Sequence, residues 1–261
     1  MRRFLGFAFL LLLQFTSGTA SAGIITYDAN AAFVAHENGA TETNPSFTPF
    51  TVGYSGTNGV FTVFSASDHT NNWSGANSAI QGFHITNFNP AVVVNTSATT
   101  ENPYSSQGLA SVDPSQIILH PGNNSTTNEN AIVRFIAPTA GVYAITGDFE
   151  SLHFGETKNE VVHNGVALFS STADNSNFNL TATLAANDHI DFVVNRSSDA
   201  YNGDSTGLRA SLTLTQAVPE PSTLAMFGMV GLAGIGARRR RNFSKCTDAS
   251  LFSLSKPRAD H

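Results

Sequence analysis

The sequence predicts an all-β protein whose strands form a two-layered antiparallel sandwich. Several segments alternate apolar and polar side chains with a period of two, turn residues recur about every ten positions, and no long stretch has the 3.6-residue period of a helix. Because successive side chains of a strand face opposite sides of its sheet, such alternation indicates one buried and one wetter face. The side chains expected in the core are Phe178, Leu180, Ile190, Phe192, Leu208 and Leu212.

The alternation is clearest in three segments, 178–184, 189–194 and 208–215, and each is an expected strand. Within a further apolar segment, Asn164-Gly165 favours a two-residue type I′ hairpin, since both residues tolerate positive φ. Twenty phenylalanines are enough to fill a core between two packed sheets. A membrane barrel is the rival architecture, but the expected strands are short and lack aromatic girdles. The other expected strands are 59–65, 91–95, 116–120, 131–136, 141–149 and 159–169.

The charges are distributed unevenly along the 261 residues. Residues 23–217 hold sixteen acidic side chains and only four basic ones, a net charge of −12. Four scattered cations cannot neutralise a row of phosphates, which excludes nucleic acid as a partner of this segment. The single cysteine, Cys246, excludes an intramolecular disulfide and a zinc site built from several thiolates.

The first residues have the three parts of an export signal. Two arginines precede the apolar run 4–15, and the small residues that follow end in the A-x-A pattern of Ala20 and Ala22. The run is shorter than the 20 or so residues that span a membrane, so an uncleaved anchor is the less favoured alternative. We expect a signal peptide over residues 1–22, removed after Ala22.

The tail from 218 to 241 has three parts in a fixed order. A rigid Pro-Glu-Pro break comes first, because prolines 219 and 221 disfavour helix, and a Gly- and Ala-rich apolar segment over 225–237 follows it. This segment is short for a membrane span, and its small residues allow close packing against another membrane helix. Four arginines close the tail and would hold its end on the cytoplasmic side.

This tail resembles the PEP-CTERM sorting signal of Gram-negative bacteria. The resemblance implies recognition by an exosortase, a membrane transpeptidase-like protease, with a short sorting helix held transiently in the inner membrane and secretion linked to extracellular polysaccharide. A plain C-terminal anchor is the alternative. Sorting signals of this kind normally stop soon after the arginines, whereas residues 242–261 follow here without a clear pattern. The residues singled out by the resemblance are Pro219, Glu220, Pro221, Arg238, Arg239, Arg240 and Arg241.

A second resemblance concerns the middle of the chain. Its motifs are Ile118-Leu119-His120-Pro121-Gly122, the strand 131–138, Asn164-Gly165, the segment 184–192 and Asp204-Ser205-Thr206-Gly207-Leu208. Together they resemble the jelly-roll domain common in exported bacterial PEP-CTERM proteins, which is similar in layout to carbohydrate-binding β-sandwich modules. The resemblance covers residues 116–215 and implies a jelly-roll ectodomain over 23–217.

The sequence carries no enzyme motif, so we expect a protein without catalytic residues. There is no G-x-S-x-G elbow and no H-E-x-x-H metal helix. Asp148 and Glu150 would share one face of a strand, but an acidic β domain has many such pairs, and glycoside hydrolysis needs two carboxylates across a cleft. The spacing of His120, His153, His163 and His189 matches no known ligand set, which favours hydrogen-bonded turn or surface histidines.

Two segments are candidates for binding. Asp199, Asn202 and Asp204 place hard oxygen donors within a few residues, which suits structural calcium, although a plain turn before the last strand is the alternative. Trp73, the only tryptophan, lies in a polar stretch and, like Tyr201, would suit a sugar ring; a half-buried residue closing one sandwich edge is the alternative. No other cofactor is expected.

These features predict a non-enzymatic protein that is secreted through the inner membrane and ends at the cell surface or in the extracellular matrix. We expect a structural or adhesive role in the polysaccharide layer. A specific carbohydrate-binding module is the first alternative, and a secreted polysaccharide hydrolase is the second. Sandwich folds host all three functions, so the fold alone does not choose among them.

Overall fold

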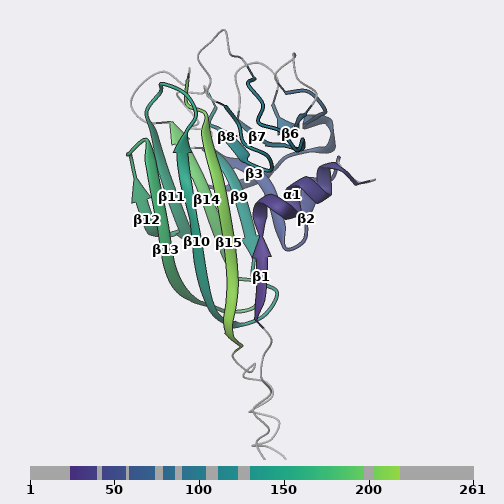
Figure 1. Ribbon diagram of the computed structural model, residues 1–261. Coiled ribbons are helices and arrows are strands. Elements are labelled where there is room, and N and C mark those ends of the chain that lie inside the picture. The colour runs from purple at the N-terminus through teal and green to yellow at the C-terminus, as the bar shows by residue number, and fades with distance from the viewer. Residues whose placement is uncertain are drawn as a thin grey trace, which may run out of the picture.

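The computed structural model describes residues 24–39, 43–56, 59–73, 79–85, 90–103, 111–122, 130–196 and 203–217, and in them two antiparallel sheets face each other (Figure 1). The predicted two-sheet sandwich is therefore confirmed, while its jelly-roll connectivity stays a prediction. The elements are β1 Ile25–Asp28, α1 Ala29–Glu37, β2 Ser46–Phe47, β3 Phe50–Ser55, β4 Phe61–Val63, the 3-10 helix η1 Ala66–Asp68, β5 His69–Thr70, β6 Ile80–His84, β7 Ala91–Asn95, β8 Ile117–His120, β9 Asn130–Ile136, β10 Gly141–Ser151, β11 Thr157–His163, β12 Val166–Ser171, β13 Asn175–Leu184, β14 His189–Arg196 and β15 Thr206–Ala217.

Sheet A has the strand order β13-β10-β15-β8-β7-β6-β5, with β1 beside β15. β15 pairs with β10 along nearly its whole length, and on its other side it changes neighbour. Its first residues pair with β8, while Ser211 to Leu214 pair with β1. Because Ile25 lies opposite Leu214, the start of β1 and the end of β15 lie at the same end of the sandwich, at the bottom of Figure 1.

Sheet B has the order β12-β11-β14-β9-β3-β2, with β4 also paired to β3. The predicted hairpin at Asn164-Gly165 joins β11 and β12 and is confirmed, because the two residues have φ of 47° and 84°. The expected segment 159–169 is thus two strands. The expected strand 59–65 is shorter, at 61–63, and β10 extends two residues past Phe149.

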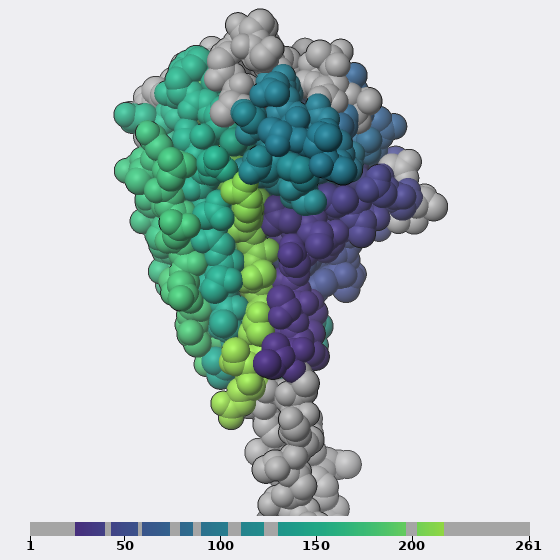
Figure 2. Space-filling model, viewed as in Figure 1, coloured from purple at the N-terminus to yellow at the C-terminus, as the bar shows by residue number. Residues whose placement is uncertain are grey.

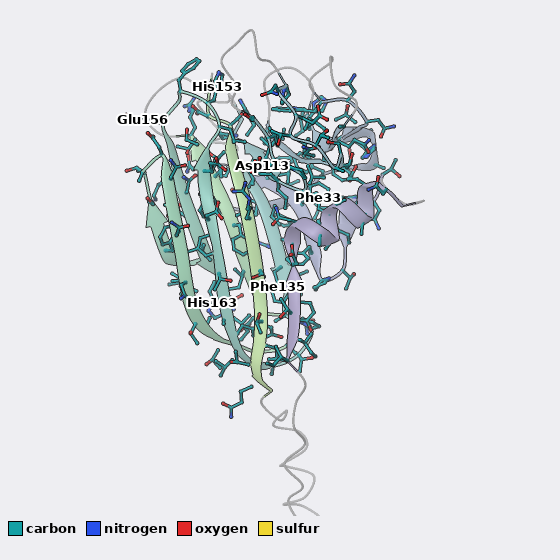
Figure 3. The ribbon with its side chains drawn as sticks, viewed as in Figure 1. Phe33, Asp113, Phe135, His153, Glu156 and His163 are labelled. Carbon is teal, nitrogen blue, oxygen red and sulfur yellow. The ribbon has the colours of Figure 1, made fainter. Side chains whose placement is uncertain are left out.

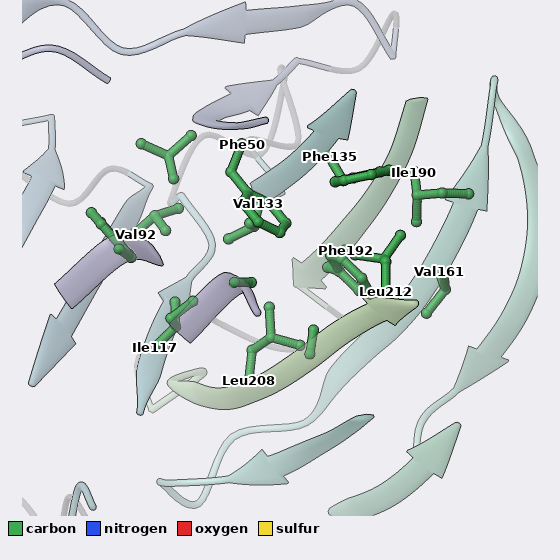
Figure 4. Packing of buried hydrophobic residues seen from close by; sticks show 14 of the residues in the cluster. Phe50, Val92, Ile117, Val133, Phe135, Val161, Ile190, Phe192, Leu208 and Leu212 are labelled. Carbon is green, nitrogen blue, oxygen red and sulfur yellow. The ribbon is translucent and has the colours of Figure 1, made fainter. Parts of the chain in front are cut away.

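One apolar core fills the space between the sheets (Figure 4). Five of the six side chains predicted inside are buried, and Leu180 is partly buried against the same cluster. Phe178 of sheet A reaches Phe192 of sheet B, with ring centroids 5.7 Å apart. The expectation that one face of β14 is exposed to water was wrong. Asp191 and Val193 on that face are only 7% and 6% exposed, so this strand is covered on both sides.

A second, smaller apolar cluster covers the outer face of sheet A over β6, β7 and β8. It consists of Ile80, Val93, Val112, Ile118 and Leu152, with Trp73 packed against it. β7 and β8 are therefore buried on both faces, which explains why their sequences are continuous apolar runs rather than an alternation.

α1 was not expected from the sequence. Asp28 caps it by accepting a hydrogen bond from the Ala31 N–H at 3.0 Å, the usual role of an aspartate at this position. Its buried face carries Phe33, whose ring stacks on Phe47 with centroids 4.9 Å apart. The helix lies directly beside β15 (Figure 2) and contributes to the main core between the sheets.

The expected signal peptide and sorting helix lie outside the described residues. In the described part of the chain, no helix is long and apolar enough to cross a membrane.

Candidate functional site

Trp73 lies at the outer face of sheet A, where it is half-buried. Its backbone N–H donates to the Ile80 carbonyl at 3.0 Å, and its ring packs on the outer apolar cluster. The ring centroid lies 6.2 Å from that of His120. The half-burial agrees with the structural alternative, but the ring covers the outer face of sheet A rather than an edge of the sandwich. Sugar binding by Trp73 stays a prediction, and Tyr201 lies outside the described residues.

The pKa of His120 is strongly perturbed. Burial lowers its pKa to about 4, a backbone hydrogen bond to Pro121 opposes the change, and the charge of nearby His153 adds to it. Its Nδ1 lies 2.8 Å from the Pro121 carbonyl oxygen, and because this oxygen can only accept, Nδ1 carries a proton and donates it. The ring of His153 in turn lies 4.2 Å from that of Phe154, which is 75% exposed.

His163 and His189, the other two histidines considered in the sequence, lie elsewhere, and Figure 3 shows His163 far from His153. His163 Nε2 lies 3.2 Å from Asp188, whose pKa is held below its ordinary value by hydrogen bonds from Asn164 and the Ala185 N–H. Burial lowers the pKa of His189. Among the described residues, no three His, Cys, Asp or Glu side chains form a group that could hold a metal ion.

Asp204 is the one member of the predicted calcium loop that the structure describes; Asp199 and Asn202 lie outside. It is fully buried, and its Oδ1 sits against Gly155, where no β-carbon would fit. The backbone on either side joins the same two segments: Gly155 N–H donates to Gly203 O at 2.8 Å, and Leu152 N–H to Ser205 O at 2.9 Å. Asp204 therefore lies where the segment 152–155 meets the start of β15.

Calcium binding at Asp204 stays a prediction with a direct test. If the loop binds calcium only when folded, calcium at 100 times its dissociation constant should add about 2.7 kcal/mol of stability. We expect a higher melting temperature with calcium than with a chelator. Asp204→Ala should remove this difference, while Asp174→Ala, which deletes an exposed carboxylate, should keep it. Equal melting curves of the unmodified protein in calcium and chelator would contradict the prediction.

The carboxylates of Asp148 and Glu150 share a face of β10, as the sequence predicts, but a cation lies between them. Arg209 Nη1 lies 3.2 Å from Asp148 and 3.1 Å from Glu150, and its Nη2 lies 2.7 Å from Asp113. Partial burial works against the charged form of Arg209, yet the hydrogen bond to Glu150 and the nearby negative charges raise its pKa. Carboxylates held in this way fit a structural role better than an acid and base across a cleft.

A groove of about 540 Å³ lies on the outer face of sheet B, and sequence reasoning missed it. Its walls come from four separate segments: the β2–β3 hairpin, β4, the end of β9, and Asn187 in the turn between β13 and β14. Val63 and Ile136 are large exposed apolar residues there, at 43% and 39% exposure. Hydroxyl groups face the same space, with Ser46 and Thr51 hydrogen-bonded to each other at 2.9 Å.

The floor of the groove is a stacked pair. The Arg134 guanidinium carbon lies 3.8 Å from the centre of the Phe61 ring, a cation–π distance. Asp191 holds the same guanidinium through two hydrogen bonds, to Nε at 2.7 Å and to Nη2 at 2.8 Å. Gly53 makes room for the ring, because a β-carbon at this position would lie 2.8 Å from it.

The tail leaves the sandwich at Ala217, the last residue of β15 and the first that the family comparison matches. Residues 217–241 are a PEP-CTERM protein-sorting motif. The motif contains Pro219, Glu220, Pro221 and the four arginines 238–241, as predicted. A PEP-CTERM motif implies an exported protein that an exosortase sorts to the surface.

No curated protein matches the chain. Among solved structures, GITRL from pika is 20% identical with a TM-score of 0.24, covering 34% of this chain and 76% of its own. A family 35 carbohydrate-binding module from Clostridium thermocellum is 13% identical with a TM-score of 0.24, covering 38% and 91%. Another module of family 35, from an environmental isolate, is 11% identical with a TM-score of 0.26, covering 53% and 96%. At these TM-scores the likeness says nothing about function.

Proposed function

We propose that this protein is a non-enzymatic component of the bacterial cell surface or extracellular matrix, with a structural or adhesive role in the polysaccharide layer. The sorting motif directly after β15 is the observation that supports it. The proposal divides the chain into a signal peptide at 1–22, an ectodomain at 23–217, the sorting signal at 218–241 and a tail at 242–261.

The geometry of the sandwich supports such a role. β1 and the end of β15 lie at one end, and the segment 151–156 and the start of β15 lie at the other (Figure 1). A domain attached through its sorting tail would therefore direct this second end away from the membrane. His153 and Glu156 lie there (Figure 3), on the side that would meet other components of the layer.

Processing at both ends is the test of this proposal. In a host with an active exosortase, intact-mass analysis should find a product that begins at Gly23 and lacks Arg238 to Arg241. Replacing Pro219, Glu220 and Pro221 by alanine should leave the C-terminal part in place, while the neighbouring Thr223→Ala should be processed normally. A mature protein that keeps its arginines in the exosortase-positive host would contradict the sorting role.

A specific carbohydrate-binding module is the second candidate, and the groove on sheet B favours it. The groove combines exposed apolar side chains with hydroxyl groups and one fixed guanidinium, a composition typical of small-molecule sites. Binding of a soluble glycan by the mature protein, measured by calorimetry, separates this candidate from a purely structural protein. A hydrolase would instead release reducing ends from the glycan that it binds.

A further inference from the structure

We propose that the groove on the outer face of sheet B binds an uncharged polysaccharide chain, with the Phe61–Arg134 stack and Ile136 as its main contacts. The proposal rests on the second candidate function, the carbohydrate-binding module, and assigns it a site and a ligand class. The site is distinct from Trp73, which packs on the outer face of the other sheet.

The side chains around the groove match the two surfaces of a sugar ring. A pyranose has an apolar face of C–H groups and a rim of hydroxyl groups. Val63, Ile136 and the Phe61 ring supply apolar contact, while the hydroxyls of Ser46 and Thr51 lie in the same lining. A volume of about 540 Å³ lies within the range of roughly 300–1,000 Å³ that ligand sites occupy.

The floor of the groove is rigid before any ligand arrives. Arg134, Asp191 and Thr51 occupy one row across three neighbouring strands, since Thr51 pairs with Arg134 and Arg134 with Asp191. Asp191 is buried and fixes the guanidinium through Nε and Nη2, so Nη1 remains to donate to a ligand hydroxyl. Groups that are already ordered lose little entropy on binding, which favours affinity.

The charges around the groove favour a neutral ligand over an acidic one. Arg134 is the one charged residue in the groove's described lining, and the carboxylate of Asp191 balances it. The ectodomain segment 23–217 carries a net charge of −12. A polyanion such as alginate would therefore be repelled by the domain and would meet no unbalanced cation in the groove.

Affinity electrophoresis and calorimetry on the mature protein test the proposal. The probes are neutral polysaccharides (glucans, mannans, galactans and xylans) and two acidic ones, alginate and polygalacturonate. We expect at least one neutral polysaccharide to bind and the acidic ones not to bind. Binding only to an acidic polysaccharide, or to none of the probes, would overturn the proposal.

Matched surface variants test the location. Ile136→Gln should weaken binding at least 10-fold, and Phe61→Ala should abolish it. The control is Leu168→Gln on β12 of the same sheet: Leu168 is 37% exposed against 39% for Ile136, lies outside the groove, and should bind as the unmodified protein does. Because Ile136 and Leu168 are both exposed, neither change should alter the melting temperature.

The outcomes separate this site from the functions on which it depends. If Trp73→Ala abolishes neutral-glycan binding and Ile136→Gln does not, the protein is a glycan binder and the groove is the wrong site. If both ends are processed but no glycan binds, the sorting role is supported. The proposals of a carbohydrate-binding module and of a glycan site in the groove are then both wrong.

Discussion

Replacing Phe192 by alanine should lower the free energy of unfolding by about 3–5 kcal/mol, the cost of removing a large aromatic side chain from a packed core. Phe192 is fully buried in the middle of β14, between Val161 on one neighbouring strand and Val133 on the other. Its ring also contacts Phe178 of the opposite sheet, so the substitution would open a cavity where the two sheets meet (Figure 4).

Denaturant unfolding measures the effect, and an exposed residue provides the control. Val166→Ala removes apolar atoms from a side chain that is 66% exposed on β12, and it should change stability by less than about 0.5 kcal/mol. A loss below about 1 kcal/mol for Phe192→Ala would mean that β14 has a different register from the one described.

The buried face of β13 and of β15 could be predicted because the two faces of each strand differ. β13 and β15 bury every second side chain, so the alternation of Phe178 or Leu208 with polar neighbours is visible in the sequence. β7 is buried on both faces, and its sequence carries no such pattern. β3 does alternate, with Phe50, Val52 and Tyr54 on one face, yet no strand was expected there. β6 was not predicted either, because it contains Gly82, a residue that is typical of loops; its φ is 137°.

The sequence at the start of α1 contains a local helix signal, but it is a weak one. Asp28 followed by an alanine-rich stretch is a usual helix start, but the nine residues of α1 are too few for a clear 3.6-residue period. The helix therefore depends on packing against the sheets, through residues such as Phe33, rather than on its own sequence.

The groove could not have been found from the sequence, because its residues come from distant segments. Only the pairing of β3 with β9 and of β9 with β14 brings Thr51, Arg134 and Asp191 into one row. Arg134 is one of the four cations of segment 23–217, but nothing near it in the sequence indicates Phe61 as its partner. The sorting motif of the tail, by contrast, could be recognised in the sequence because all its parts are contiguous.

Asn30 at the start of α1 fills a gap in sheet A. On one side of β15, β8 pairs with it up to Leu208 and β1 pairs with it from Ser211 onward. The backbone of residues 209–210 therefore has no neighbouring strand on this side. The Asn30 side chain takes the place of one: Nδ2 donates to Leu208 O at 2.7 Å, and Oδ1 accepts from the Ala210 N–H at 3.0 Å. Nδ2 also donates to Ser115 O at 2.9 Å.

Asn30→Ala should therefore cost about 3 kcal/mol of unfolding free energy, because it leaves backbone groups of β15 buried and unpaired at about 1–3 kcal/mol each. Asn38→Ala is the matched control, since Asn38 is exposed at the other end of the same helix and should change stability by less than about 0.5 kcal/mol. Asn30→Asp should cost at least as much as Asn30→Ala, because a carboxylate oxygen in place of Nδ2 would face the Leu208 and Ser115 carbonyl oxygens without a proton to donate, and its buried charge adds a desolvation cost. If Asn30→Ala unfolds at the same denaturant concentration as Asn38→Ala, β15 does not depend on this side chain, and water must satisfy the gap where the strand changes neighbour.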